Sequence, residues 1–119
     1  MENMTITVLG TEYTILFKNR IDDSGLDGYN GYCNCFTKEI VVCDLSEDES
    51  MSGESHFSIS ELMHAVLRHE IIHAFLYESG LLEDAIITHE AWPVNEEMVD
   101  WFALQAPKIY SVYRKVGCI

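Results

Sequence analysis

The chain has 119 residues, of which 20 are acidic and 7 are basic, giving a formal net charge of −13, and 48% of its residues are hydrophobic. This length fits one domain, and so acidic a surface repels phosphate backbones, which argues against nucleic-acid binding. The charge would attract basic partners or peptide segments at low salt, but solubility is the favoured reason for it. No apolar run approaches the ~20 residues of a membrane helix, and the start at Met1 lacks a signal peptide, so we expect a cytoplasmic protein with no membrane association.

The first third of the chain predicts a small antiparallel sheet of three to four strands. Segments rich in β-branched and aromatic residues recur there, separated by short turns and by one polar loop. The expected strands are residues 5–9, 13–17, 31–36 and 39–44, and the loop is 18–30. Helical patterns follow, so the sequence predicts an α+β fold.

Residues 45–56 form an acidic segment between the sheet and the first helix. Its serines and carboxylates predict a loop with few buried contacts. Two interpretations stay open, namely a surface loop without a role and a flap over an active cleft.

A long helix is expected from about Ser58 to Ser79. Ser58 and Glu61 have the spacing of a capping box, no Pro or Gly interrupts the segment, and Gly80 supplies the left-handed stop of a helix end. Apolar residues occur nearly all around this helix, which predicts that it is buried between two layers.

The motif His69-Glu70-Ile71-Ile72-His73 lies within this helix. Histidines four residues apart share one helix face, about 6 Å from each other, so both imidazoles can reach one metal ion. The intervening glutamate can meet a water on that metal. This is the HExxH arrangement of zinc-dependent peptidases, with Glu70 as the catalytic base.

A catalytic zinc usually takes three protein ligands. A histidine six residues after His73 would indicate a metzincin, but that position is Ser79. Downstream, Glu96 and Asp100 lie four residues apart on one face of a second expected helix. Glu97, about 100° around that helix, is the alternative metal ligand.

The sequence Asn95-Glu96-x-x-x-Asp100 resembles the second motif of gluzincin peptidases. The resemblance implies that Glu96 is the third zinc ligand, that Asp100 orients His69, and that Asn95 lies beside His73. Such outer partners fix the tautomer and orientation of a ligating imidazole.

Residues 96–107 also resemble the ImmA/IrrE family of small zinc peptidases, through Val99-Asp100, Phe102-Ala103 and Pro107. The likeness covers residues 58–107. It implies a minimal zincin-like domain over residues 1–119, in which two metal-binding helices and a C-terminal helix follow the sheet. It further implies an intracellular enzyme of bacteria or their mobile elements that cleaves a regulatory protein. Val and Asp replace the family's usual small residue and Asn, and no helix-turn-helix segment is attached.

Other residues leave alternatives open. His89 could bind a substrate oxyanion or face water, and Pro107 is expected to end the second helix and begin a third that runs to about Val116. On that helix, Tyr110 or Tyr113 belongs to the core or reaches the cleft.

The four cysteines, Cys33, Cys35, Cys43 and Cys118, are expected to be reduced and buried. An upstream thiol, from Cys35 or Cys43, would be the third ligand of a deformylase-like metal hydrolase. The remaining alternative is a non-catalytic domain that zinc stabilises and that binds a protein partner. The leading interpretation is a zinc peptidase that binds its substrate along the edge of the hairpin at residues 31–44.

Overall fold

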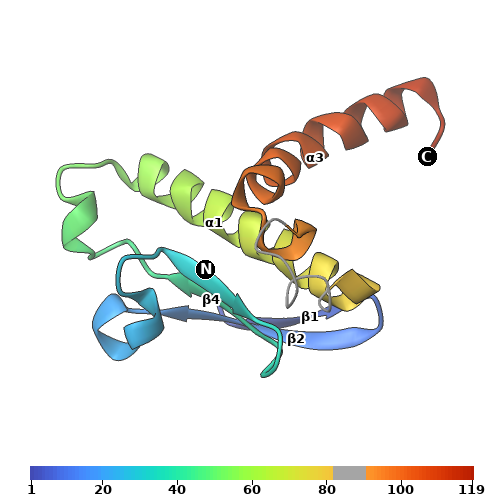
Figure 1. Ribbon diagram of the computed structural model, residues 1–119. Coiled ribbons are helices and arrows are strands. Elements are labelled where there is room, and N and C mark those ends of the chain that lie inside the picture. Colours follow the sequence, from blue (N-terminus) through green and yellow to red (C-terminus); the bar gives the residue numbers. More distant parts are fainter. Residues whose placement is uncertain (82–90) are drawn as a thin grey trace.

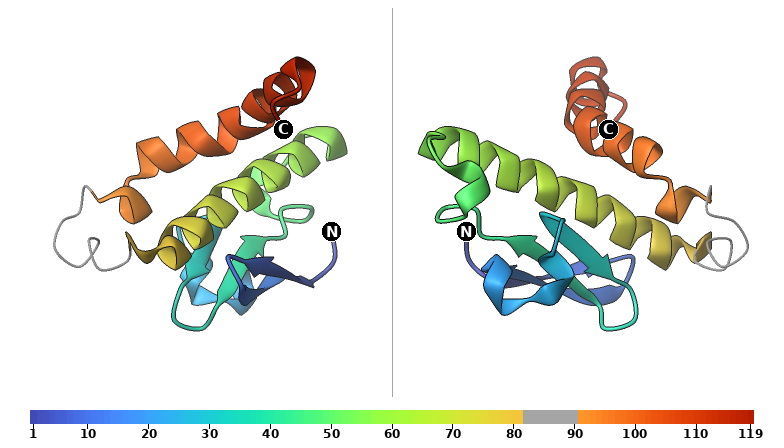
Figure 2. Two further views of the ribbon diagram at one scale, coloured as in Figure 1. Left: turned by 90° about the vertical axis from the view of Figure 1, so that its right-hand side faces the viewer. Right: turned by 60° about the vertical axis from the view of Figure 1, so that its left-hand side comes forward.

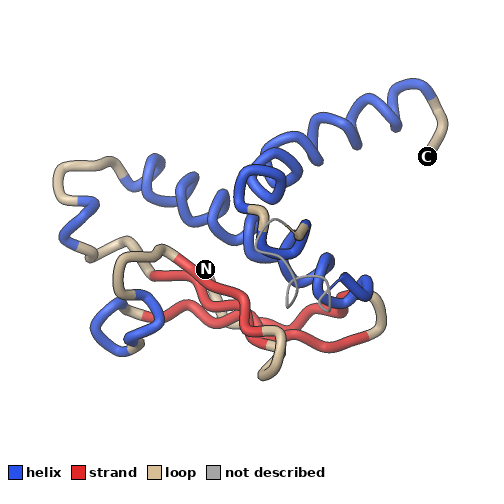
Figure 3. The backbone as a smooth tube through the Cα atoms, viewed as in Figure 1, coloured by secondary structure: helices blue, strands red, loops and turns tan. Residues whose placement is uncertain are grey.

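A computed structural model describes residues 1–81 and 91–119. A four-stranded sheet forms one layer, helix α1 (His56–Leu76) lies across it, and helix α3 (Glu96–Val116) packs on α1 (Figures 1 and 2). The α+β class expected from the sequence is confirmed, and Figure 3 distinguishes the strands (red) from the helices (blue). Along the chain, the two long helices follow the sheet. None of the helices in the described ranges combines the length and apolar character needed to cross a membrane.

The sheet consists of β1 (Met4–Val8), β2 (Thr11–Lys18), β3 (Gly31–Asn34) and β4 (Glu39–Cys43) in the order β1-β2-β4-β3. The two hairpins, β1–β2 and β3–β4, are antiparallel as expected, but β2 and β4 pair in parallel. The expectation of a wholly antiparallel sheet is therefore wrong for this pair. Sequence patterns locate each hairpin but do not say which of its strands joins the other hairpin.

This order makes β4 an inner strand and β3 an edge strand. All four apolar residues of β4, from Ile40 to Cys43, are buried, as expected for a strand with neighbours on both sides and a helix above it. The core continues into β2 through Tyr13 and Ile15, and into α1 through three residues, Ile59, Met63 and Ala74. One edge of the sheet, β3, is thus held directly beneath α1.

Helix α1 starts three residues earlier than the sequence pattern predicts. Ser55, rather than Ser58, is the N-cap, and its hydroxyl accepts a hydrogen bond from the backbone N–H of Ser58 at 3.1 Å. Both serines can cap a helix, and the sequence does not rank them. A π-helical turn, Tyr77–Leu81, follows, and Gly80 adopts φ +94°, the left-handed conformation expected there.

Helix α3 is continuous from Glu96 to Val116, so the predicted break at Pro107 is wrong, and the expected third helix is the second half of this one. Pro107 is exposed, and the helix continues through it without a break. Val99 and Ala103 are buried in the first half, whereas nearly all residues beyond 105 are exposed. The first half therefore anchors α3 on α1.

The loops at one end of the sheet are tied together by Arg20. Its guanidinium donates hydrogen bonds to Asp48, to the side chain of Asn30 and to the backbone oxygens of Leu26 and Tyr29. The acidic segment at residues 45–56 is thereby attached near the start of α1, about 20 Å along the helix from His69. This position favours the interpretation of that segment as a surface loop over that of a flap on the cleft.

Candidate metal centre

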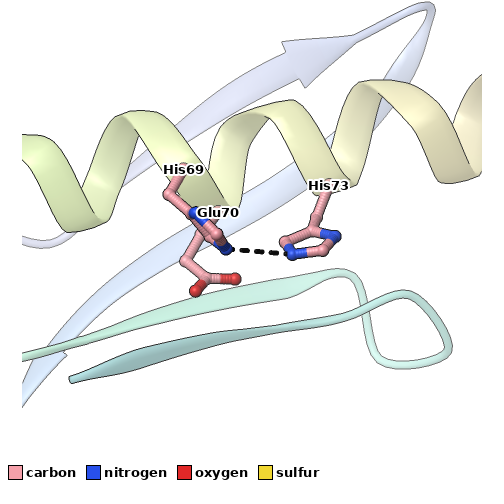
Figure 4. Close-up of side chains that lie close together, drawn as sticks. All are labelled: His69, Glu70 and His73. Carbon is pink, nitrogen blue, oxygen red and sulfur yellow. Dashed lines mark hydrogen bonds between the residues drawn. The ribbon is translucent and has the colours of Figure 1, made fainter. Parts of the chain in front are cut away.

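Helix α1 places His69, Glu70 and His73 on the side that faces the β3–β4 hairpin (Figure 4). The Nε2 atoms of the two histidines lie 3.1 Å apart, and one ligand atom from each of the three residues falls within 4.8 Å of the others. The arrangement follows from helix geometry, since residues i and i+4 share a face. These residues form a group that could hold a metal ion.

The carboxylate of Glu96 approaches both histidines from the first turn of α3. Its Oε2 lies 3.1 Å from Nε2 of His69, and its Oε1 lies 2.9 Å from Nε2 of His73. For bond lengths of about 2.0–2.1 Å, a tetrahedral zinc ion would separate its ligand atoms by about 3.3 Å. The spacing of the two imidazoles and this carboxylate is close to that value.

The outer ring nitrogens are already occupied. Nδ1 of His69 lies 2.6 Å from Oδ1 of Asp100, and Nδ1 of His73 lies 2.6 Å from the backbone oxygen of Pro93. Both partners are acceptors, so each Nδ1 carries the proton, and in a neutral imidazole Nε2 then presents a lone pair. Two nitrogen lone pairs and a carboxylate converge on one point, and that arrangement is repulsive without a cation or a proton between them. The donor set therefore fits a metal ion.

Burial also favours the neutral form of the His73 imidazole. Its side chain is 8% exposed, and desolvation lowers its pKa despite the nearby charge of Glu96. A neutral imidazole is the form that binds metal.

The two neighbours of Glu96 in sequence do not take the roles considered for them, Asn95 as a partner of His73 and Glu97 as a metal ligand. The side chain of Asn95, which the resemblance placed beside His73, is the N-cap of α3 and accepts a hydrogen bond from the backbone N–H of Met98 at 3.0 Å. Glu97, the alternative ligand, is exposed and makes no polar contact with either histidine in the described ranges. Geometry favours Glu96 because its oxygens reach both rings.

Glu70 is buried between α1 and the edge strand, with only 7% of its surface exposed. Its pKa is raised from 4.5 to about 7, mainly by burial; nearby His69 opposes this shift, and the carboxylates of Glu96 and Asp100 add to it. A carboxylate whose pKa lies near neutrality is suited to accept and return a proton. It can do so beside the imidazoles if the metal is held by the other three side chains, His69, His73 and Glu96.

Gly31 allows β3 to approach this site closely. A Cβ atom at position 31 would lie 2.6 Å from a methyl carbon of Val66, 2.9 Å from the backbone oxygen of Val41 and 3.4 Å from Cγ of Glu70. Only a glycine lets the strand and helix meet at this distance. The motif residues alone do not indicate that a glycine is needed at position 31, because Gly31 lies 39 positions upstream of Glu70.

A cleft runs past the site as two adjoining cavities. One has a volume of about 430 Å³ and extends toward Cys33 and Tyr77; the other, of about 310 Å³, extends toward Leu62 and Val66. Both are lined by four shared residues, Tyr29, Gly31, Glu70 and Glu96. The group of His69, His73 and Glu96 thus borders a cavity on either side, beside the edge strand β3.

Tyr77 is a residue of the cleft that the sequence analysis did not single out. Its ring stacks on the imidazole of His73 with centroids 5.9 Å apart and an interplanar angle of 17°. The available signal was its spacing, since it follows His73 by four residues on the same helix face.

The other residues named from the sequence lie away from the site. Tyr110 and Tyr113 are exposed on the second half of α3 and line neither cleft cavity, and His89 lies outside the described residues.

The cysteines are free thiols, of which Cys35 and Cys43 are buried and Cys33 is partly buried, as expected, whereas Cys118 is exposed. Burial raises the pKa of Cys33 to about 12, so this thiol is neutral in the metal-free protein. In the described part of the chain no cysteine belongs to the group that could hold a metal. This distribution gives no support to a deformylase-like ligand set.

Comparison of the chain with protein-family models, with curated proteins and with solved structures gave no match. The likeness to gluzincin and ImmA/IrrE peptidases therefore depends on the quoted motifs alone.

Proposed function

We propose that this chain is a zinc-dependent metallopeptidase that hydrolyses a peptide bond in an intracellular protein. The observation that carries the proposal is the convergence of His69, His73 and Glu96, whose facing atoms lie 2.9–3.1 Å apart while both Nδ1 atoms are held by acceptors. Two histidines and one glutamate are a ligand set typical of catalytic zinc, with one position left for solvent.

The buried carboxylate of Glu70 is the general base. Zinc, when bound, supplies Lewis acidity toward the scissile carbonyl and toward water. The Glu70 carboxylate takes a proton as water attacks the carbonyl carbon, and then passes that proton to the leaving amine. Glu70 lies beside the two imidazoles in the same cleft, within reach of a water bound there. Asp100 and the Pro93 carbonyl keep the two imidazoles in the tautomer that presents Nε2.

The substrate is proposed to lie along β3. This strand is at an edge of the sheet, so its outer N–H and C=O groups can pair with an extended peptide. The two cavities then receive side chains on either side of the scissile bond. The lining of the smaller one includes Leu62, Ala65 and Val66, which suits an aliphatic side chain.

The decisive experiment compares the zinc-loaded protein with the variant Glu70→Gln. Zinc content is measured together with cleavage of a library of fluorogenic peptides. We expect the variant to keep zinc and lose nearly all hydrolysis, while Glu61→Gln, which alters an exposed carboxylate of the same helix, cleaves normally.

Normal turnover by Glu70→Gln would contradict its role as the base. A wild-type protein that binds zinc tightly but cleaves none of the peptides would instead favour a zinc-stabilised binding domain. X-ray absorption of the zinc form tests the ligand set, because a sulfur ligand would contradict the assignment of Glu96.

A further inference from the structure

The phenol of Tyr77 is placed at the cleft in a way that the metal centre does not require. Tyr77 follows α1 directly, its ring lies parallel to that of His73 at 5.9 Å, and it lines the same 430 Å³ cavity as Glu70 and Glu96. Its ring is therefore held by stacking on His73, and both residues line this cavity.

The hydroxyl of Tyr77 differs from those of the other phenols in the protein's interior. The hydroxyl of Tyr13 donates to Glu78 at 2.6 Å, and that of Tyr32 donates to Asp23 at 2.6 Å. By contrast, the Tyr77 hydroxyl has no hydrogen-bond partner among residues 1–81 and 91–119, where every fully buried side-chain polar atom does have one. The side chain of Tyr77 lines the cavity, and at neutral pH a phenol carries a proton that it can donate.

We propose that Tyr77 is a catalytic residue whose O–H donates a hydrogen bond to the oxyanion formed at the scissile carbonyl. The proposal rests on the peptidase function proposed above. In the step concerned, the water oxygen bonds to the carbonyl carbon and the C=O π pair moves onto the carbonyl oxygen. The proton from water goes to Glu70, and Tyr77 keeps its own proton throughout.

A fixed donor aimed at a developing oxyanion stabilises the transition state more than the substrate. Removal of such a donor typically lowers kcat by about 10²–10³-fold. Because the stacked ring is the part that packs on His73, Tyr77→Phe keeps that contact and removes only the hydroxyl.

The experiment measures Tyr77→Phe in two ways on the zinc-loaded protein. The first is turnover of a peptide that the wild type cleaves, with kcat and KM determined separately. The second is calorimetric affinity for N-phosphoryl-leucyl-phenylalaninamide, whose phosphoryl oxygens resemble a tetrahedral oxyanion, and for mercaptoacetyl-leucine, a zinc ligand that lacks them. Tyr113→Phe is the matched control, because it removes an exposed phenol far along α3.

We expect Tyr77→Phe to lower kcat by about 100-fold or more with little change in KM. The variant should also bind the phosphoryl ligand more weakly, while its affinity for the thiol ligand stays unchanged. Unchanged kcat together with unchanged phosphoryl affinity would overturn the proposal. Should the wild type bind zinc but cleave no peptide, the peptidase function fails, and the phosphoryl affinity alone then decides whether Tyr77 is an oxyanion donor. If the affinities for both ligands fall equally, or if zinc binding weakens, Tyr77 has only a structural role, and that result would also overturn the proposal.

Discussion

Glu70 should destabilise the metal-free protein at neutral pH, and Glu70→Gln should relieve that effect. In the folded chain burial raises its pKa to about 7, whereas the ordinary value is 4.5. Each pKa unit corresponds to about 1.4 kcal/mol, so a shift from 4.5 to about 7 lowers the stability of the folded state by roughly 3–4 kcal/mol once the group is ionised in both states.

The pH dependence has a defined sign. Below pH 4.5 the carboxyl is protonated in both states, and its burial adds no charge penalty. Between pH 4.5 and about 7 the unfolded chain ionises while the folded chain keeps the proton, so stability falls as pH rises, and above that range the loss stays constant. A glutamine is neutral at every pH and escapes this loss.

The assay is urea unfolding of the chelator-treated wild type and variant at several pH values from 5 to 8. The stability of Glu70→Gln relative to wild type should increase by about 2–3 kcal/mol across this range. Any pH-independent effect of the buried amide appears equally at pH 5 and cancels. Glu61→Gln, which changes an exposed carboxylate on the same helix, should show no such increase. A difference between wild type and Glu70→Gln that stays flat with pH would refute the reasoning.

Three other outcomes are expected. Glu96→Ala should weaken zinc binding strongly in a calorimetric titration and Glu97→Ala should not, because only Glu96 reaches both imidazoles; the reverse ranking would transfer the ligand role. Asp100→Ala should weaken zinc about 10–100-fold by freeing Nδ1 of His69, and unaltered affinity would contradict that role. Gly31→Ala should cost about 1–3 kcal/mol in urea unfolding and lower peptide turnover, because its Cβ would meet Val66 at 2.6 Å; wild-type stability and turnover would show that β3 can shift freely.

Local patterns in the sequence were enough to predict the parts of the fold that depend on near neighbours. Both hairpins, the long helix and its stop at Gly80 follow from alternation, periodicity and turn residues, which act over a few positions. The exact start of α1 and the continuity of α3 through Pro107 were missed. At the start of α1, two serines can each act as the N-cap. In α3, an exposed Pro107 is accommodated by a helix that is held by packing of its first half, although proline usually ends a helix.

The sequence by itself determined that His69, Glu70 and His73 share one side of a helix, because a helix has a fixed period. The sequence also indicated Glu96 and Asp100 as partners of the two histidines, but spacing along the chain does not determine whether the second helix packs beside the first. Only the tertiary structure decided that Glu96 rather than Glu97 faces the imidazoles, and that the Pro93 carbonyl rather than Asn95 holds His73. It likewise decided the parallel pairing of β2 with β4, which leaves β3 at the edge beside Glu70. These choices depend on contacts between residues far apart in the chain, where the packing of whole elements outweighs any local preference.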